Sequence, residues 1–310
     1  MGVRLIQDPD YGYLRIDPIP TVAEVERFYR EEFYGRSRAN YVNDSGLDNM
    51  REEAEFHLRT YADYFDVIRR GVERTGGNFS KLTVADIGCG FGYWLKYLRD
   101  HGIEGFGVEP VQEGIDHCSQ LGLEGHCVPI ESLATPPRSR RVSLVTMINV
   151  LEHLREPAAV LKALRSSWLE PGGYVFLKVP NEFNPFQVAA NQQHHLKQWW
   201  VVPPQHINYF SRQSLIGLLD YCGYGEVDTM ATFPLEMFLL MDDVYVGNPE
   251  LGKQIHHKRV TFERNLDTNN LADFRRNWYR QLAQSGIGRE MIVLAKANGG
   301  AGSAASPRNE

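Results

Sequence analysis

The sequence predicts an α/β protein built on a doubly wound, mostly parallel sheet, and two observations support this prediction. Short apolar runs alternate with segments of helical periodicity between residues 81 and 230. Four of these runs are mainly apolar, which is typical of strands that helices cover on both faces. The four runs span residues 82–87, 105–109, 143–148 and 174–179. A fifth run, at 289–297, predicts the last strand of the same sheet.

The rest of the chain divides into segments around this core. Residues 1–80 carry two aromatic-rich helical segments separated by a polar stretch with loop composition, which predicts an N-terminal helical lid or substrate-binding region. Two later segments interrupt the alternation and are predicted insertions. The predicted units are 1–80 for the lid, 81–233 for the core with its insertion at 181–210, 234–285 for a helical insertion, 286–297 for the last core strand and 298–310 for a disordered tail.

Composition excludes several classes of protein. The formal net charge is -6, from 33 Lys and Arg against 39 Asp and Glu, so the broad positive field that attracts nucleic acid is not expected. No apolar run approaches the roughly 20 residues of a membrane span. The four cysteines form no C-x-x-C pair. We therefore expect a cytoplasmic protein without a nucleic-acid or membrane partner; its oligomeric state, a homodimer included, stays open.

Glycines follow the first core strand at alternate positions in VADIGCGFGYW, residues 84–94. The strand ends near Asp86, and a helix is predicted to start at about Tyr93. Gly88, Gly90 and Gly92 would let the backbone approach a ligand closely, because glycine has no Cβ and a free choice of φ. In a doubly wound sheet the crevice at this place is the ligand site, and the helix start adds free N–H groups.

The second predicted strand ends in a carboxylate, Glu109, which lies 23 residues after Asp86. An acid at this place can accept hydrogen bonds from both ribose hydroxyls of a nucleoside. The dinucleotide fingerprint G-x-G-x-x-G would require glycine at position 93, where the chain has Tyr93. A nucleoside other than a dinucleotide is therefore favoured, with a tight turn beside two incidental acids as the alternative.

Two stretches resemble class I S-adenosylmethionine-dependent methyltransferases, especially the small-molecule branch that includes ubiquinone-type O-methyltransferases. They are VADIGCGFGYWLKYLRDHGIEGFGVEP (84–110) and NVLEHLREPAAVLKALRSSWLEPGGYVFLKVPN (149–181). The resemblance covers about 81–230 and the last strand. It implies a Rossmann-like, seven-stranded sheet with an antiparallel final hairpin, and S-adenosyl-L-methionine as cofactor. Ser143 departs from the aspartate that usually begins the fourth strand of this family.

The resemblance also implies a set of cofactor contacts. Asp86, Gly88 and Gly90 would line the methionine part, Glu109 would bind the ribose, and the segment VPIESLA would flank the adenine. The full set is Asp86, Gly88, Cys89, Gly90, Gly92, Glu109, Pro110, Ile130, Glu131 and Asn149, with Tyr34 and Tyr41 from the lid.

Candidate acceptor-side residues follow the fourth and fifth strands. Glu152, His153 and His206 are the candidate catalytic residues, and satisfying backbone groups near helix starts is the alternative role. Candidate substrate contacts in the insertion are Trp199 and Trp200, as a stacking pair, with Asn208 and Tyr209; packing against the sheet is the alternative for the tryptophans. His256 and Arg259 are candidate contacts on a basic helix face, for which a solvated surface is the alternative. No metal site is expected, because adjacent histidines such as His194 and His195 rarely ligate one ion.

These observations favour methyl transfer to a small polar acceptor. The basic face could bind an anionic group of that acceptor. O-methylation of a sugar, nucleotide-sugar or glycan precursor is the specific hypothesis, drawn from the tryptophan pair and the basic insertion. N- or C-methylation of another small metabolite, an NAD-dependent oxidoreductase and a catalytically silent binding subunit remain the alternatives.

Overall fold

The structure is a computed structural model that describes residues 3–28, 44–129 and 132–299. Four predicted cofactor contacts, Tyr34, Tyr41, Ile130 and Glu131, lie outside the described residues. In the described part of the chain, no helix is both long and apolar enough to cross a membrane.

The main sheet has seven strands in the order β5-β4-β3-β6-β7-β10-β9. Their bounds are β3 Thr83–Ile87, β4 Glu104–Glu109, β5 Glu124–Cys127, β6 Val142–Ile148, β7 Leu169–Pro180, β9 Tyr224–Ala231 and β10 Glu290–Ala297. The five strands from β5 to β7 pair in parallel, and β10 lies antiparallel between β7 and β9. The predicted seven-stranded, mostly parallel sheet with an antiparallel final hairpin is therefore confirmed.

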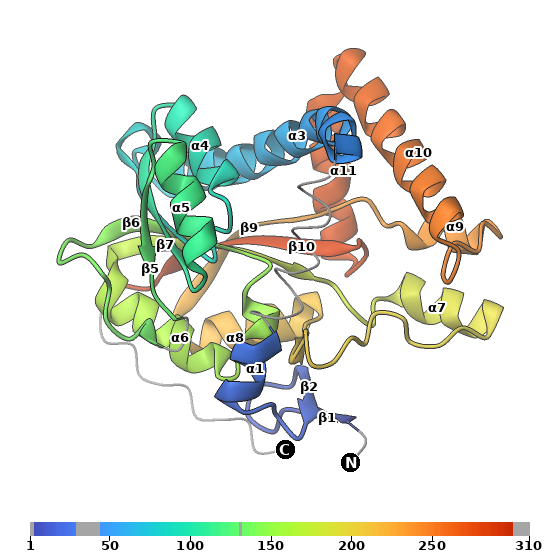
Figure 1. Ribbon diagram of the computed structural model, residues 1–310, viewed down its shortest axis with the longest axis horizontal. Helices are drawn as coiled ribbons and strands as arrows, with labels where there is room; N and C mark the ends of the chain where they lie inside the picture. Colours follow the sequence, from blue (N-terminus) through green and yellow to red (C-terminus); the bar gives the residue numbers. More distant parts are fainter. Residues whose placement is uncertain (1–2, 29–43, 130–131, 300–310) are drawn as a thin grey trace.

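Helices cover both faces of this sheet, as the apolar strands predict (Figure 1). Successive strand residues point to opposite faces, so Val84 and Ala85 enter different cores. One core lies under α3 (Asp44–Arg74), α4 (Tyr93–Asp100) and α11 (Ala272–Gln284). The other lies against α6 (Pro157–Ala163), the one-turn segment η5 (Leu164–Trp168) and α8 (Arg212–Tyr221), and α5 (Gln112–Gln120) packs on β4 and β5.

A second, three-stranded sheet joins the N-terminus to the 181–210 insertion. It consists of β1 (Arg4–Gln7), β2 (Leu14–Asp17) and β8 (Asn208–Tyr209), all antiparallel. Its small core contains Trp200 and residues of α1 (Val22–Phe28). Neither β1 nor the pairing of these strands was predicted from the sequence. The insertion also contains α7 (Pro185–His194).

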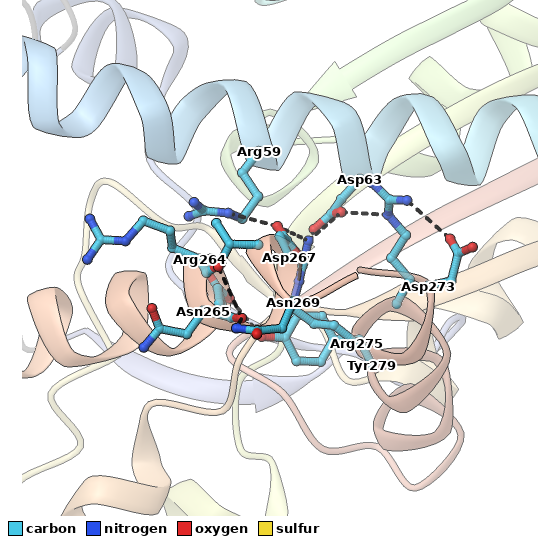
Figure 2. Close-up of polar contacts among 12 residues, drawn as sticks. Arg59, Asp63, Arg264, Asn265, Asp267, Asn269, Asp273, Arg275 and Tyr279 are labelled. Atoms are coloured by element: carbon cyan, nitrogen blue, oxygen red, sulfur yellow. Dashed lines mark hydrogen bonds and ion pairs between the residues drawn. The ribbon is translucent and has the colours of Figure 1, made fainter. Parts of the chain in front are cut away.

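The second insertion docks onto the core through buried charges. It forms α9 (Glu236–Leu240), α10 (Pro249–Thr268) and α11, and the short helix η2 (Phe79–Lys81) follows α3. Figure 2 shows the guanidinium of Arg275 on α11 between Asp63 of α3 and Asp267 of α10, with donor–acceptor distances of 2.6 to 3.1 Å. Arg275 is 1% exposed, so these ion pairs are shielded from solvent and fix how the insertion packs on α3.

Candidate active site

The glycine turn between β3 and α4 has left-handed backbone at all three glycines. Their φ angles are 71° at Gly88, 52° at Gly90 and 77° at Gly92. A Cβ at Gly88 would lie 2.4 Å from Val150 Cγ2, and one at Gly92 would lie 2.6 Å from Cys118 Sγ. A Cβ at Gly90 would meet nothing within 4 Å. The sequence attributed all three glycines to ligand approach, whereas two of them make room for the protein's own side chains and only Gly90 borders open space.

Glu109 lies directly beside this turn. Its Oε2 accepts a hydrogen bond from Gly90 N at 3.1 Å, and its Oε1 accepts one from Val111 N at 3.3 Å. The side chain is 4% exposed. A carboxylate oxygen has two lone pairs, so these backbone bonds fix the carboxylate while leaving capacity to accept from ligand hydroxyls.

Asp86 is a buried residue of β3 and lies two residues before Gly88. Burial raises the pKa of Asp86 to about 7, although a 2.6 Å hydrogen bond from Thr146 Oγ1 favours its charged form. The nearby Glu109 charge also raises this pKa. A positively charged ligand group held here would favour the ionised carboxylate, so the turn is suited to a cation next to a nucleoside.

The other predicted cofactor residues flank the turn. Cys89 is buried with its Sγ 3.9 Å from Cys118 Sγ, and Pro110 O accepts from Cys127 Sγ at 3.5 Å. Asn149 is exposed at the end of β6 with a φ of 56°, and its N donates to Lys178 O. Asparagine adopts this left-handed conformation more readily than most other non-glycine residues.

Four polar side chains meet next to the turn, and we call them the Glu–His cluster: Glu152, His153, Glu182 and His206. Glu152 and His153 belong to the one-turn helix η4 (Leu151–His153), which begins directly after Val150, the residue that packs on Gly88. Glu182 follows β7. His206 precedes β8. The sequence missed Glu182, although an acid just beyond a parallel strand is the same signal that identified Glu109.

Distances within the Glu–His cluster are short. His153 Nε2 lies 3.7 Å from Glu152 Oε1, and His206 Nδ1 lies 3.5 Å from Glu182 Oε1. The two imidazole centroids are 5.1 Å apart. Burial raises the pKa of Glu152 to about 7 and lowers the pKa of His153 to about 4, the latter with a further lowering by His206. Near neutral pH, His153 is therefore an uncharged imidazole, and Glu152 can exchange a proton.

Backbone bonds hold the insertion against η4. Ile207 N donates to Glu152 O at 2.9 Å, and Gln205 O contacts His153 Nδ1 at 2.6 Å. Asn208 Nδ2 donates to Leu154 O at 2.6 Å and to Leu151 O at 3.3 Å. The predicted substrate contact Asn208 thus acts as a brace that brings His206 to Glu152.

Other predicted substrate contacts are packed into the protein. Trp200 is 2% exposed and meets Phe183 edge to face, with centroids 5.3 Å apart, so it offers no open stacking face. Trp199 stands edge to face on Trp200 at 4.7 Å. The Tyr209 hydroxyl donates to His206 O and accepts from Val202 N. The packing alternative therefore fits Trp200 and Tyr209 better than a stacking platform.

The predicted basic face on α10 is divided by the fold. Arg259 is buried, lies 4.6 Å over the Phe56 ring and has its Nε 3.4 Å from Glu263 Oε1. His256 meets the same ring edge to face at 5.2 Å. Both side chains therefore pack between α10 and α3, while Lys253 and His257 are exposed. Helical periodicity predicted that Lys253, His256 and His257 share a face with Arg259 nearby, but not that α3 covers part of it.

Comparisons with known proteins agree with this geometry. A family model described as a methyltransferase domain matches residues 59–227. The ubiquinone biosynthesis O-methyltransferase of Serratia proteamaculans is 29% identical over 157 residues, which cover 48% of this chain and 64% of that protein. Its Bordetella bronchiseptica counterpart is 31% identical over 120 residues, covering 37% and 48%. The chain thus spans about half to two thirds of the length of these curated relatives.

A solved structure of similar fold is the magnesium protoporphyrin IX methyltransferase of Synechocystis, determined with bound SAH. It superposes with a TM-score of 0.50 at 14% identity, covering 90% of this chain and 100% of that one. At this identity the likeness concerns the fold alone.

Proposed function

The chain belongs to the methyltransferase-domain family, and from this premise we propose that it transfers a methyl group from S-adenosylmethionine to an oxygen of a small polar metabolite. The observation that carries the proposal is the juxtaposition of two halves at one edge of the sheet. Glu109 and the glycine turn form one half, and the Glu–His cluster, connected to the turn through Val150 and Gly88, forms the other.

The described residues fit this cofactor. Gly90 leaves open space where the backbone turns, and Glu109 is fixed beside it with capacity to accept from ribose hydroxyls. Asp86 is a carboxyl group with a pKa of about 7 because it is buried, and its charged form would be favoured by the cationic groups of the methionine arm. When bound, the cofactor supplies an electrophilic methyl group on a sulfonium.

The chain's own contribution begins with orientation. Holding an acceptor in line with a bound reactant can contribute roughly 7–11 kcal/mol in the best cases. The glycine turn and Glu109 fix one reactant, and the rigid η4 segment, bonded through its backbone to Ile207, presents the polar groups that would fix the other. Glu109, η4 and Glu182 lie at strand ends of the same sheet, whereas His206 is positioned by the insertion.

The Glu–His cluster supports oxygen as the acceptor atom. A hydroxyl must lose its proton as it becomes methylated, and a positioned group that takes the proton contributes about 10²–10⁴-fold. Glu152, with its pKa near 7, and His206, beside Glu182, are groups of this kind. The sugar, nucleotide-sugar or glycan precursor remains our narrower hypothesis. Its support is now the polar cluster, because Trp200 is packed away from any stacking position.

The experiment that tests the cofactor half is calorimetry of S-adenosylhomocysteine binding to Glu109→Gln. Each lost hydrogen bond to the charged carboxylate is worth about 1.5–3 kcal/mol. We expect at least about a 100-fold weaker affinity, since two ribose hydroxyls lose their charged acceptor. Glu104→Gln is the matched control, because Glu104 begins the same strand but is exposed at its other end. An unchanged affinity in Glu109→Gln would refute the assignment.

The transfer itself is tested with radiolabelled methyl donor and small hydroxylated acceptors, starting with sugars and nucleotide-sugars. Label in an ether product that resists mild base supports transfer to oxygen. Label recovered only in an amine, or no transfer to any metabolite of a cell extract, would overturn the proposal.

A further inference from the structure

The Glu–His cluster has the composition of a metal site. One ligand atom from each of Glu152, His153 and His206 lies within 4.8 Å of the others. Two imidazoles and a carboxylate are a ligand set typical of catalytic zinc and of non-haem iron, which keep positions open for a substrate oxygen. From the sequence, only His194, His195 and His206 were candidate metal ligands, and no metal site was expected.

The ring of His153 is held as a ligand would be. Its Nδ1 contacts Gln205 O at 2.6 Å, so Nδ1 carries the proton and Nε2 faces Glu152 Oε1 at 3.7 Å. Metal-binding histidines usually donate their other N–H to a carbonyl or carboxylate in this way.

Three buried polar atoms around the Glu–His cluster have no hydrogen-bond partner among the described residues. They are Glu152 Oε2, Glu182 Oε2 and His206 Nδ1, and both glutamates are at most 2% exposed. Buried carboxylate oxygens that accept nothing are costly, unless a cation is close to them. These atoms converge from η4, from the end of β7 and from the loop before β8, so no local helix or turn geometry accounts for their meeting.

We propose that Glu152, His153 and His206 bind one divalent transition-metal ion, with Glu182 completing the site either as a fourth ligand or as the carboxylate that orients His206. An ion with bonds of about 2.1 Å keeps tetrahedral ligands about 3.4 Å apart. The separations of 3.7 Å at Glu152 and 3.5 Å at Glu182 are within a few tenths of an ångström of that value.

Resting on the proposed function, the ion would have a direct use. An acceptor hydroxyl that binds the ion loses its proton to water more readily, so Glu152 and His206 act as metal ligands and do not take the proton themselves. The same ion fixes the oxygen for methyl transfer. Two nitrogen ligands favour Zn²⁺ or Fe²⁺ over Mg²⁺, which prefers oxygen and water. The fitting acceptors carry a hydroxyl beside a second oxygen donor, such as a vicinal diol or a hydroxy acid.

The test uses the full chain, freed of metal with a chelator, and Co²⁺ alone as the probe. We expect one equivalent to bind, with visible absorption bands of a nitrogen- and oxygen-bound ion, and Zn²⁺ but not Mg²⁺ to displace it. Losing an outer partner of a metal site costs about 10–100-fold in affinity, so losing a ligand in His206→Ala or Glu152→Gln should cost at least about 100-fold.

The matched control is His195→Asn, which removes an exposed imidazole from the same insertion and retains a residue suited to its φ of 51°. Affinity for S-adenosylhomocysteine, measured in every variant, reports an intact cofactor half independently of the metal. Absence of Co²⁺ binding, binding unchanged in both ligand variants, or full methyl transfer in chelator would each overturn the metal site. If the unmutated chain does not bind S-adenosylhomocysteine, the proposed function is overturned instead.

Discussion

Replacing Glu152 by glutamine should make the protein more stable at high pH, and this is the sharpest prediction from the buried Glu–His cluster. Glu152 is 1% exposed, and burial raises its pKa from an ordinary 4.5 to about 7. A carboxyl group with a raised pKa contributes stability that is fully present below pH 4.5 and is lost as the pH rises through about 7. Glutamine has the same shape and never ionises, so the variant avoids this loss.

The magnitude follows from the two pKa values. A change from 4.5 to about 7 corresponds in full to about 3 kcal/mol. Between pH 5 and pH 8 the linkage relation gives a loss of about 2 to 3 kcal/mol in the unmutated protein. His153 and Asp86 titrate in both proteins, so their contributions largely cancel in the difference. The free energy of unfolding of Glu152→Gln relative to the unmutated chain should therefore rise by about 2 to 3 kcal/mol across this range.

The assay is urea unfolding at pH 5 and pH 8, with chelator present so that a bound ion does not compensate the carboxylate. Glu156→Gln is the control, because Glu156 is exposed four residues further along the chain, and its relative stability should not change with pH. A difference for Glu152→Gln that is the same at both pH values, or that falls as the pH rises, would refute the argument that burial raises the pKa of Glu152 more than nearby charges lower it.

Two further predictions concern the turn and the docked insertion. Gly88→Ala should lower the free energy of unfolding by several kcal/mol because φ is 71° and the new methyl would lie 2.4 Å from Val150 Cγ2. Gly90→Ala should cost only about 1 kcal/mol but weaken S-adenosylhomocysteine binding in calorimetry, since its methyl enters open space. Arg275→Met should cost about 3 kcal/mol in urea unfolding, because Asp63 and Asp267 lose their shared buried partner, whereas the more exposed Arg276→Met should cost less. Equal stabilities of the two glycine variants, or of the two arginine variants, would contradict these arguments.

The sheet was predictable because its signals are local. Four of the five parallel strands are mainly apolar runs, and the glycine turn follows β3 within a few residues. The fifth, β5, reads EGHC and was not predicted. Glu109 could be identified because it ends the next strand, and strand ends of a parallel sheet share an edge. None of these inferences required knowing which distant residues meet.

The small sheet and the helix faces could not be predicted in this way. β1 is four residues long with half-exposed apolar side chains, and its partner β2 pairs with β8, about 190 residues later in the chain. The burial of Trp200 depends on that sheet, so a tryptophan pair in a loop could equally have been a stacking platform. On α10, the inward side of His256 and Arg259 is decided by Phe56 of α3, about 200 residues earlier in the chain.

The two halves of the site differ in how the chain assembles them, and this difference explains why the cofactor is easier to infer than the acceptor. Asp86, the glycine turn and Glu109 come from one continuous β–α–β unit. The Glu–His cluster comes from three segments that backbone bonds, chiefly Ile207 N to Glu152 O, hold together. The last of these segments leads into β8, which pairs with β2. A change in the β1–β2–β8 sheet would therefore move His206 relative to Glu152 and leave the glycine turn in place, so acceptor choice can vary on a constant cofactor half.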